Sequence, residues 1–493
     1  MSSLTAEKRN ELLSDLARMG SQGRAEGEST DNLAKTFYPV KEHLRMLDPE
    51  VVMVVGPRGS GKTEIFRVVT DANLAEAISQ ETGTLHLKKI RSIKWLKGFP
   101  LGRDGFDANG LRRFIDASND DIDAVQRLWF AYLVRVLRHD LVENSPLLGE
   151  LLKAQGGAST EIYQAYVKAN DTPLLQLDKI DEQLERDDRY VYIGYDELDT
   201  LGGSDWEAMT KGVQGLVAFW AAYTRRWRRI RPKVFLRTDL FERFSTSGGA
   251  DLAKIAANRV EISWSERQLY SMLLKRIANT SDQLSEYIRE TTSGVDWKDH
   301  ITLGALPFMR KWTDARPVIE RMIGPYMGAN RNKGLSYRWP LAHVQDGCGR
   351  AIPRPLVRLF EEAASLQINS TFAVAGMRIL HSSSLRRAID RVSSEHVDHA
   401  RDEWNWIDGV IDRLSGLTVP IARRDVEKRL GSEGPWSKTP REEIQPPFSD
   451  PRTLLDYLVE IGLLRARSDG RIEAPDLFLY GLGLKHKGGV RRR

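Results

Sequence analysis

One stretch, from position 51 to position 69, constrains the fold more than any other. Five apolar residues, four of them valine, occupy positions 51–55 and predict a buried strand. A glycine-bearing loop comes next, and the residues after it have a helical pattern. The loop and the first two helical positions read G-x-x-x-x-G-K-T, and they are Gly56, Pro57, Arg58, Gly59, Ser60, Gly61, Lys62 and Thr63. The strand, this spacing and the helix together predict a phosphate-binding loop.

The residue types in this loop suit the chemistry of a phosphate chain. Glycine reaches positive φ without strain and leaves backbone N–H groups free to surround phosphate oxygens. The positive end of the helix dipole falls at the same place. We expect Lys62 to contact the β and γ phosphates and the Thr63 hydroxyl to bind Mg²⁺. The alternative is a chance glycine turn before a helix, which is disfavoured because strand, spacing and helix occur together.

A second apolar strand, starting near position 189, ends in two carboxylates, Asp196 and Glu197. In a nucleotide-hydrolysing site the first acid holds Mg²⁺ and the second polarises the attacking water. Both must then lie at the carboxyl end of a strand beside the phosphate loop, where ligands collect in open α/β sheets. The alternative is a strand that ends in a solvated acidic turn. The nearby Asp199 is expected to be a helix cap.

Further positions are candidates for sensing the nucleotide or completing the site. Another short apolar strand ends in Arg237-Thr238-Asp239, which would place one of these side chains near the γ-phosphate. Arg259, at a strand start, is a candidate arginine finger, a group that neutralises charge developing in the transition state. Arg354, at a helix start, is a candidate second sensor in a helical lid. The alternatives are an ordinary strand end and two surface arginines.

The remaining elements are predicted from periodicity and turn signals. Residues 285–400 are expected to be mostly helical, and 463–475 to form a hairpin with Asp-Gly at its turn. Three helices before that hairpin complete a winged-helix pattern. Its third helix is apolar and acidic, which favours a protein contact over base reading. The other expected elements are helices at 6–19, 124–137 and 266–279, and strands at 84–90 and 258–264.

Composition narrows the class of protein. The chain has 493 residues, 41% hydrophobic and 29% charged, without an 18-residue apolar run or an apolar N-terminal signal, so we expect a cytoplasmic protein of two to four domains. Its single cysteine, Cys348, excludes an intrachain disulfide. The net charge of +5 is mild. Two basic clusters, Arg225–Lys233 and Lys485–Arg493, are candidates for non-specific contact with DNA.

In their order along the chain, these motifs resemble those of the additional-strand P-loop ATPases, specifically the AAA+ and STAND group. The resemblance implies a three-layer α/β core with a central parallel sheet, and ATP and Mg²⁺ bound between this core and a helical lid. It makes Thr238 (or Arg237) the first sensor, Arg354 the second and Arg259 the finger. The implied division is an N-terminal helix and linker (1–35), a P-loop core (36–284), a helical lid with an insertion at 295–350 (285–400) and a winged helix with a basic tail (401–493).

The resemblance also implies an activity. We expect an ATPase that works as a switch, in which Arg259 completes the site of a neighbouring copy and the winged helix transmits the nucleotide state to an oligomer or a partner protein. Similar bacterial ATPases are linked with anti-phage defence and mobile elements. The alternative is a DNA-associated ATPase, such as a loader or a transposition or replication regulator.

Overall fold

The computed structural model describes residues 3–20, 29–83, 90–98, 108–118, 121–141, 160, 162–164, 167, 172–201, 206–245, 255–290, 294–401, 403–436 and 445–487. Contacts group the chain into two compact units. One comprises residues 39–263, and the other comprises the residues up to 38 together with those from 264 onward. The chain therefore passes between the units twice. The four-part domain division expected from the sequence remains a prediction.

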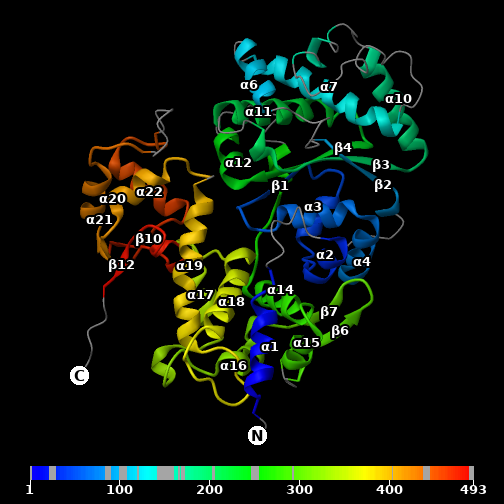
Figure 1. Cartoon of the computed structure of the whole chain (residues 1–493). Helices are drawn as coiled ribbons and strands as arrows, with labels where there is room; N and C mark the ends of the chain where they lie inside the picture. The colour runs from blue at the N-terminus through cyan, green and yellow to red at the C-terminus, as the bar shows by residue number, and fades with distance from the viewer. Residues whose placement is uncertain are drawn as a thin grey trace. The chain divides into compact units, whose positions relative to one another are not determined.

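In the described part of unit 39–263, the strands form a five-stranded parallel sheet with the order β2-β3-β4-β1-β5 (Figure 1). The strands are β1 (Met53–Gly56), β2 (Ile93–Lys97), β3 (Tyr190–Tyr195), β4 (Ile230–Arg237) and β5 (Val260–Glu261). The phosphate-loop strand β1 and the acid-bearing strand β3 are not neighbours, because β4 lies between them. This is the additional strand that the sequence resemblance implied, and the predicted fold class is confirmed.

Helices cover both faces of this sheet. Figure 1 shows α7 and α11 on one side and α3 and α4 on the other. The helices of the unit are η2 (His43–Leu47), α3 (Lys62–Thr70), α4 (Ala72–Thr82), α6 (Ala108–Ala117), α7 (Ile122–Leu141), α10 (Thr172–Arg186), η4 (Leu198–Thr200), α11 (Trp206–Tyr223) and α12 (Thr238–Ser245). The helix predicted at 124–137 is confirmed as α7.

Bulky rings and one glycine set how closely these helices approach the sheet. On the α7/α11 side, the rings of Trp129 and Trp220 lie edge-on to Tyr195 of β3, at 5.7 and 6.3 Å between centroids. On the α3 side, Phe66 packs onto β3 at Gly194, where an added Cβ would lie 2.2 Å from the ring. Glycine at this position therefore lets the phosphate-loop helix sit directly on the sheet.

Two strand predictions differ from the structure. The strand expected at 84–90 falls largely on residues 84–89, which lie outside the described part of the chain. The strand that pairs with β3 is Ile93–Lys97. At the other edge, the strand predicted at 258–264 is confirmed but is short, because only Val260–Glu261 has ladder pairing with β1.

The second unit is mainly helical, with α18 and α19 side by side and α1 along α18 (Figure 1). Before the C-terminal module, its elements are α1 (Ala6–Leu16), α2 (Thr30–Thr36), α14 (Glu266–Ala278), α15 (Asp282–Arg289), β6 (Asp296–His300), β7 (Gly304–Phe308), η5 (Trp312–Ala315), α16 (Arg316–Ile323), η6 (Arg331–Lys333), α17 (Trp339–His343), α18 (Pro353–Ile368) and α19 (Ser382–Ala400). The helices predicted at 6–19 and 266–279 are confirmed as α1 and α14. The antiparallel hairpin β6–β7 was not predicted within the region expected to be mostly helical.

The N-terminal helix α1 is part of the core of this unit. Leu12, Leu13 and Leu16 are at most 2% exposed. The Arg9 guanidinium donates hydrogen bonds to the carbonyls of Arg378 (2.9 Å) and Gly376 (3.0 Å). Burial of three leucines contributes several kcal/mol, at about 1.5–3 kcal/mol for each. Residues more than 300 positions apart in the sequence therefore build one core.

The C-terminal residues form the predicted winged helix. Its elements are β8 (Thr418–Val419), β9 (Ile421–Ala422), β10 (Arg465–Ala466), β11 (Arg471–Glu473), β12 (Lys485–His486), α20 (Ile407–Leu414), α21 (Arg423–Leu430), α22 (Pro451–Glu460) and α23 (Asp476–Leu479). The wing hairpin β10–β11 turns at Asp469-Gly470, where Gly470 has φ of 79°. Within the described residues β11 also pairs with β9, which gives a three-stranded sheet.

Candidate nucleotide site

The phosphate loop has the geometry that its sequence predicts. Gly59 and Gly61 have φ of 80° and 98°, in the left-handed region that favours glycine. Gly61 is also the N-cap residue of α3. At Gly56, a Cβ would lie 2.7 Å from the Ser60 Oγ and 3.0 Å from the Ile262 side chain. The loop is therefore closed tightly between the end of β1 and the start of α3, and larger residues do not fit there.

Lys62 turns back onto the loop. Its Nζ donates hydrogen bonds to the carbonyls of Gly56 (2.7 Å) and Pro57 (3.0 Å). These contacts hold a positive charge inside the loop, at the N-terminus of α3, where the helix dipole adds to it. A phosphate chain in the loop would meet this ammonium group directly.

Thr63 and Asp196, predicted to share a metal ion, are in contact. The Thr63 hydroxyl hydrogen-bonds to the Asp196 carboxylate, and Lys62 lies close enough to stabilise its charge. Burial nevertheless raises the pKa of Asp196 above its ordinary value, because desolvation outweighs these interactions. The Asp196 Oδ2 atom is buried and has no hydrogen-bond partner among the residues that the structure describes. A hydroxyl and an unsatisfied carboxylate oxygen, both hard oxygen ligands, fit a Mg²⁺ ion.

Glu197 has an unusual backbone. Its φ of 59° and ψ of 28° are left-handed, a conformation that costs a non-glycine residue on the order of 1–3 kcal/mol. The Thr200 N–H (2.9 Å) and hydroxyl (2.8 Å) both donate to the Glu197 carbonyl and hold this turn. Such strain is concentrated at functional sites. The second carboxylate therefore follows β3 at a fixed and strained position, next to Asp196.

The end of β4 supplies a charged group that the sequence only partly revealed. Arg237 is the register partner of Gly56 and is buried. Its guanidinium binds both carboxylate oxygens of Asp239, at 3.1 and 2.8 Å, and one oxygen of Asp199 at 3.4 Å. Asp199, which was expected to cap a helix, thus binds the same buried arginine, Arg237, as Asp239 does. Thr238 is the first residue of α12. The signal for this cluster was the Arg-Thr-Asp strand end, but its link to Asp199 needs the tertiary fold.

Two other arginines were predicted to act at the site. Arg259 donates to a Glu261 oxygen from Nε (2.9 Å) and Nη2 (2.6 Å) and to the Ala256 carbonyl from Nη1 (3.0 Å). It is therefore engaged within its own unit. Arg354 belongs to the other unit, where it lies exposed in the first turn of α18. There, burial lowers the pKa of His396 to about 3, and the charges of His399 and Arg354 add to this effect.

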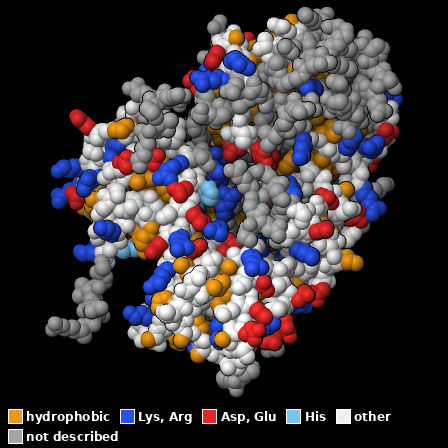
Figure 2. All heavy atoms as spheres, viewed as in Figure 1, with side chains coloured by type: hydrophobic (Ala, Val, Ile, Leu, Met, Phe, Trp, Pro, Cys, Tyr) orange, Lys and Arg blue, Asp and Glu red, His pale blue; other side chains and the backbone are white. Residues whose placement is uncertain are grey.

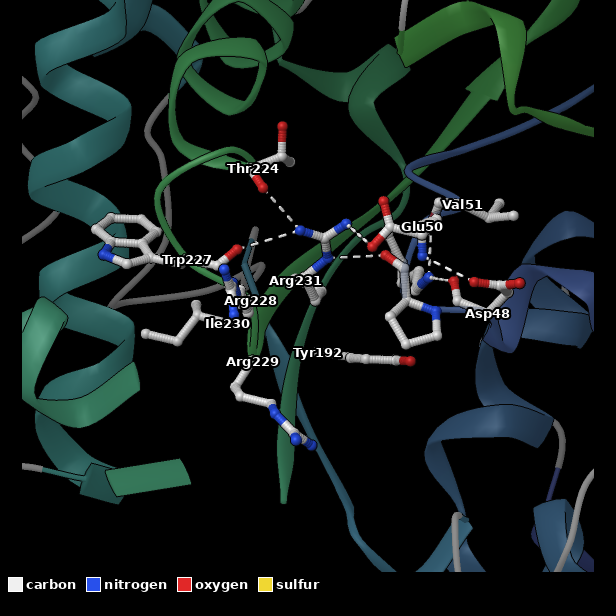
Figure 3. A network of polar contacts seen from close by, with 12 residues as sticks. Asp48, Glu50, Val51, Tyr192, Thr224, Trp227, Arg228, Arg229, Ile230 and Arg231 are labelled. Atoms are coloured by element: carbon white, nitrogen blue, oxygen red, sulfur yellow. Dashed lines mark hydrogen bonds and ion pairs between the residues drawn. The ribbon is translucent and has the colours of Figure 1, made fainter. Parts of the chain in front are cut away.

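The basic cluster Arg225–Lys233 is largely structural. Figure 3 shows Arg231 bonded to the carbonyls of Thr224 and Trp227 and to Glu50. Lys233, 0% exposed, donates to the carbonyls of Asp48 and Val51, both at 2.5 Å. The three other described pairs lie nearer the surface: Arg226–Asp178 at 2.6 Å, Arg228–Glu185 at 3.6 Å and Arg229–Asp188 at 3.0 Å. Arg231 and Lys233 thus brace the segment that enters β1.

The surface charge of the second unit is uneven. Figure 2 shows Asp and Glu side chains gathered on the face over α1 and α15. Glu7, Glu11 and Asp15 line a shallow hollow there, together with Asn10, Ser14 and Gln283. Of the basic tail, residues 488–493 lie outside the described part. Within the described residues, we find no helix with the length and apolar character needed to cross a membrane.

Comparisons with known proteins add little to this picture. No protein-family model and no curated protein matches the chain. Among solved structures, Cdc6p from Pyrobaculum aerophilum matches with a TM-score of 0.31 and 12% identity, over 92% of this chain and 96% of that chain. The ORC2 protein of Aeropyrum pernix, in ADPNP–ADP complexes, matches with a TM-score of 0.29 and 12% identity, over 94% and 95%. At these TM-scores the likeness carries no argument, so the fold assignment rests on strand order and the winged helix.

Proposed function

We propose that this chain is an ATP-binding and ATP-hydrolysing switch of the AAA+/STAND kind, acting in the cytoplasm. The observation that carries the proposal is the meeting of Lys62, Thr63 and Asp196 at the start of α3, with one Asp196 oxygen buried and unsatisfied. A buried acid with a raised pKa is costly to keep unless a cation binds it. The setting that the sequence resemblance suggests is anti-phage defence or signalling, with nucleotide state coupled to oligomerisation or to a partner protein.

The residues divide the work of hydrolysis between them. The loop N–H groups and Lys62 bind the phosphates, and Thr63 and Asp196 would hold Mg²⁺, whose charge neutralises phosphate oxygens. Glu197 would orient the attacking water and accept its proton, because a carboxylate held at a fixed place can do both. Thr238 or Arg237 would sense the γ-phosphate from the end of β4, and Arg354 would contact it from the helical region.

The test separates binding from turnover. Lys62→Ala should abolish binding of a fluorescent ATP analogue, because it removes the ammonium group that the loop carbonyls hold. Glu197→Gln should bind ATP but hydrolyse it at least about 100-fold more slowly. Glu185→Gln, a surface carboxylate on α10, is the control and should behave as wild type. Normal steady-state turnover by Glu197→Gln contradicts its catalytic role, and normal binding by Lys62→Ala contradicts the whole site.

A composite site between copies is the second part of the proposal. Arg259 would leave Glu261 to reach the nucleotide of a neighbouring copy. The ATPase rate per subunit should then rise with protein concentration, and Arg259→Ala should remove that rise. Glu261→Gln, which weakens the ion pair that holds Arg259, should leave the rise with concentration in place. A rate per subunit that is independent of concentration contradicts an oligomeric switch of this kind.

The alternative function is a DNA-associated ATPase. It is favoured by the winged helix and by the run of basic residues at 485–493. Deleting residues 488–493 should then weaken binding to duplex DNA, and binding should fall steeply with salt. The structural role of Arg231 and Lys233 leaves the exposed Arg225 and Arg228 as the better second test, by paired substitution with glutamine. Absence of binding at low salt removes this alternative.

A further inference from the structure

The segment 343–350, between α17 and α18, has contacts that the proposed ATPase does not use. It is a closed turn, in which the Asp346 N–H donates to the Arg350 carbonyl at 2.9 Å. The Asp346 Oδ1 atom accepts the backbone N–H groups of Cys348 (2.9 Å) and Arg350 (2.8 Å). The Arg350 Nε donates to Asp346 Oδ2 at 2.7 Å. One carboxylate therefore organises the whole turn.

That face covers the C-terminal end of α22 in the winged helix. The last carbonyls of a helix have no partner within it and need donors from elsewhere. Here Gly347 N–H donates to the Gly462 carbonyl at 2.6 Å, the Cys348 thiol to that of Glu460 at 3.2 Å and Arg350 Nη2 to that of Ile461 at 3.2 Å. The turn thus binds carbonyls at the end of α22 and just past it.

The winged helix contributes donors in return. Arg465, the first residue of β10, donates from Nε to the Gly347 carbonyl (3.2 Å) and from Nη2 to the Asp346 carbonyl (3.0 Å). The backbones also approach closely, because a Cβ on Gly347 would lie 2.1 Å from the Leu464 carbonyl oxygen and 2.9 Å from that of Gly462. Backbone atoms cannot swing aside as a flexible side chain does, so this contact requires glycine.

A second contact lies at the start of the same segment. His343 bonds through Nδ1 to the Trp339 carbonyl at 2.8 Å, and its Nε2 lies 3.4 Å from an oxygen of Asp476 in α23. The same short stretch of chain thus contacts the winged helix at two separate elements, α22 and α23.

We propose that residues 343–350 are a strap that fixes the winged helix to the helical region, so that these two parts move as one body. The strap gives one end of the insertion at 295–350 a structural role. This role does not depend on nucleotide binding. Hydrogen bonds run in both directions between the strap and the winged helix, and the close backbone contact fixes their register.

The single cysteine of the chain lies in the strap and reports its state. The thiolate is the species that reacts with disulfide reagents. Cys348 is exposed, but partial burial raises the pKa of its thiol, and the hydrogen bond to the Glu460 carbonyl favours the protonated form. In the full-length protein, a disulfide reagent such as dithiobis-nitrobenzoate should therefore react with Cys348 slowly. Gly347→Ala, a wedge between the two backbones, should raise that rate about fivefold. Arg350→Ala removes the bond to the Ile461 carbonyl, but it also removes a charge that lowers the pKa of the Cys348 thiol, so this variant is followed by hydrogen exchange.

The control is Arg331→Ala, another exposed arginine of the same insertion, which should leave the rate unchanged. Hydrogen exchange gives an independent reading: amides of residues 458–466 should lose protection in both strap variants and not in the control. If Gly347→Ala does not fold, the hydrogen exchange of Arg350→Ala decides alone. Exchange in the strap variants equal to that of Arg331→Ala would overturn the proposal.

Discussion

Arg237 and Gly56 are register partners across β4 and β1, so a buried arginine lies beside the first glycine of the phosphate loop. Two carboxylates, those of Asp239 and Asp199, bind its guanidinium. Asp199 follows Glu197 by two residues, in the short helix η4. The arginine thus joins the end of the additional strand to the turn that carries the candidate catalytic acid.

Removing that arginine should destabilise the unit that contains it. Arg237→Ala leaves Asp239 and Asp199 without their shared partner, and breaking a buried pair on one side costs about 3–5 kcal/mol. The loss should appear as a lower urea midpoint for residues 39–263. Arg228→Ala, which removes a surface pair at 3.6 Å, should change the midpoint little. Equal effects of the two variants would contradict the role given to Arg237.

Neutralising Asp196 should stabilise the metal-free protein while abolishing Mg²⁺-dependent nucleotide binding. With its pKa raised in the folded state, the native protein holds a proton that the unfolded chain has lost. Stability therefore falls as pH rises from the ordinary carboxyl value of 3.8 through the raised pKa. Asp196→Asn removes this loss and should raise Tm at pH 7 by about 3 °C without Mg²⁺. A lower Tm for Asp196→Asn than for wild type would contradict a destabilising burial of the Asp196 carboxylate.

Lys233 should be essential to the stability of the sheet. Lys233→Ala leaves the carbonyls of Asp48 and Val51 without donors and opens a cavity beneath Tyr192, whose ring lies 4.5 Å from Nζ. The cost should be about 3 kcal/mol or more, measured by urea unfolding. The exposed Arg225→Ala should be nearly neutral in the same assay. Comparable stability of both variants would mean that the carbonyls find other donors.

The acid sensitivity of the second unit should depend on His396. Its pKa of about 3 in the folded state lies below the ordinary histidine value of 6.5, so the unfolded chain binds a proton that the native protein does not. Stability is then complete above about pH 6.5 and falls by about 1.4 kcal/mol per pH unit below it. His396→Phe should flatten this slope between pH 6.5 and 4, as followed by chemical unfolding. Parallel slopes for the two proteins would show that other groups dominate.

Local patterns predicted the elements that are fixed by local rules. The loop Gly56–Thr63 combines strand, spacing and helix start, and it adopts the expected positive φ at Gly59 and Gly61. The wing hairpin turns at Asp469-Gly470 as its turn residues require. The helix predicted at 124–137 had enough turns for its apolar face to be unambiguous.

The sequence-based predictions fail where tertiary contacts determine the structure. The run Arg225–Lys233 looks like a solvated basic patch, because nothing in the sequence shows that Lys233 pairs in register with Gly194 in the middle of a sheet. The hairpin β6–β7 has a mixed, half-exposed pattern that local reading cannot separate from its helical surroundings. In β2, three of five positions are only half-buried, which weakens the alternation that predicts a strand.

The packing of α1 against α18 has a consequence for synthesis. Unit 39–263 is continuous in sequence and can complete its core while the chain is still being made, whereas Leu12, Leu13 and Leu16 must wait for residues 353–368. At about 5–20 residues per second, that delay is on the order of tens of seconds. During this time the apolar face of α1 has no partner from α18, so the N-terminal helix is among the last parts of the chain to be packed.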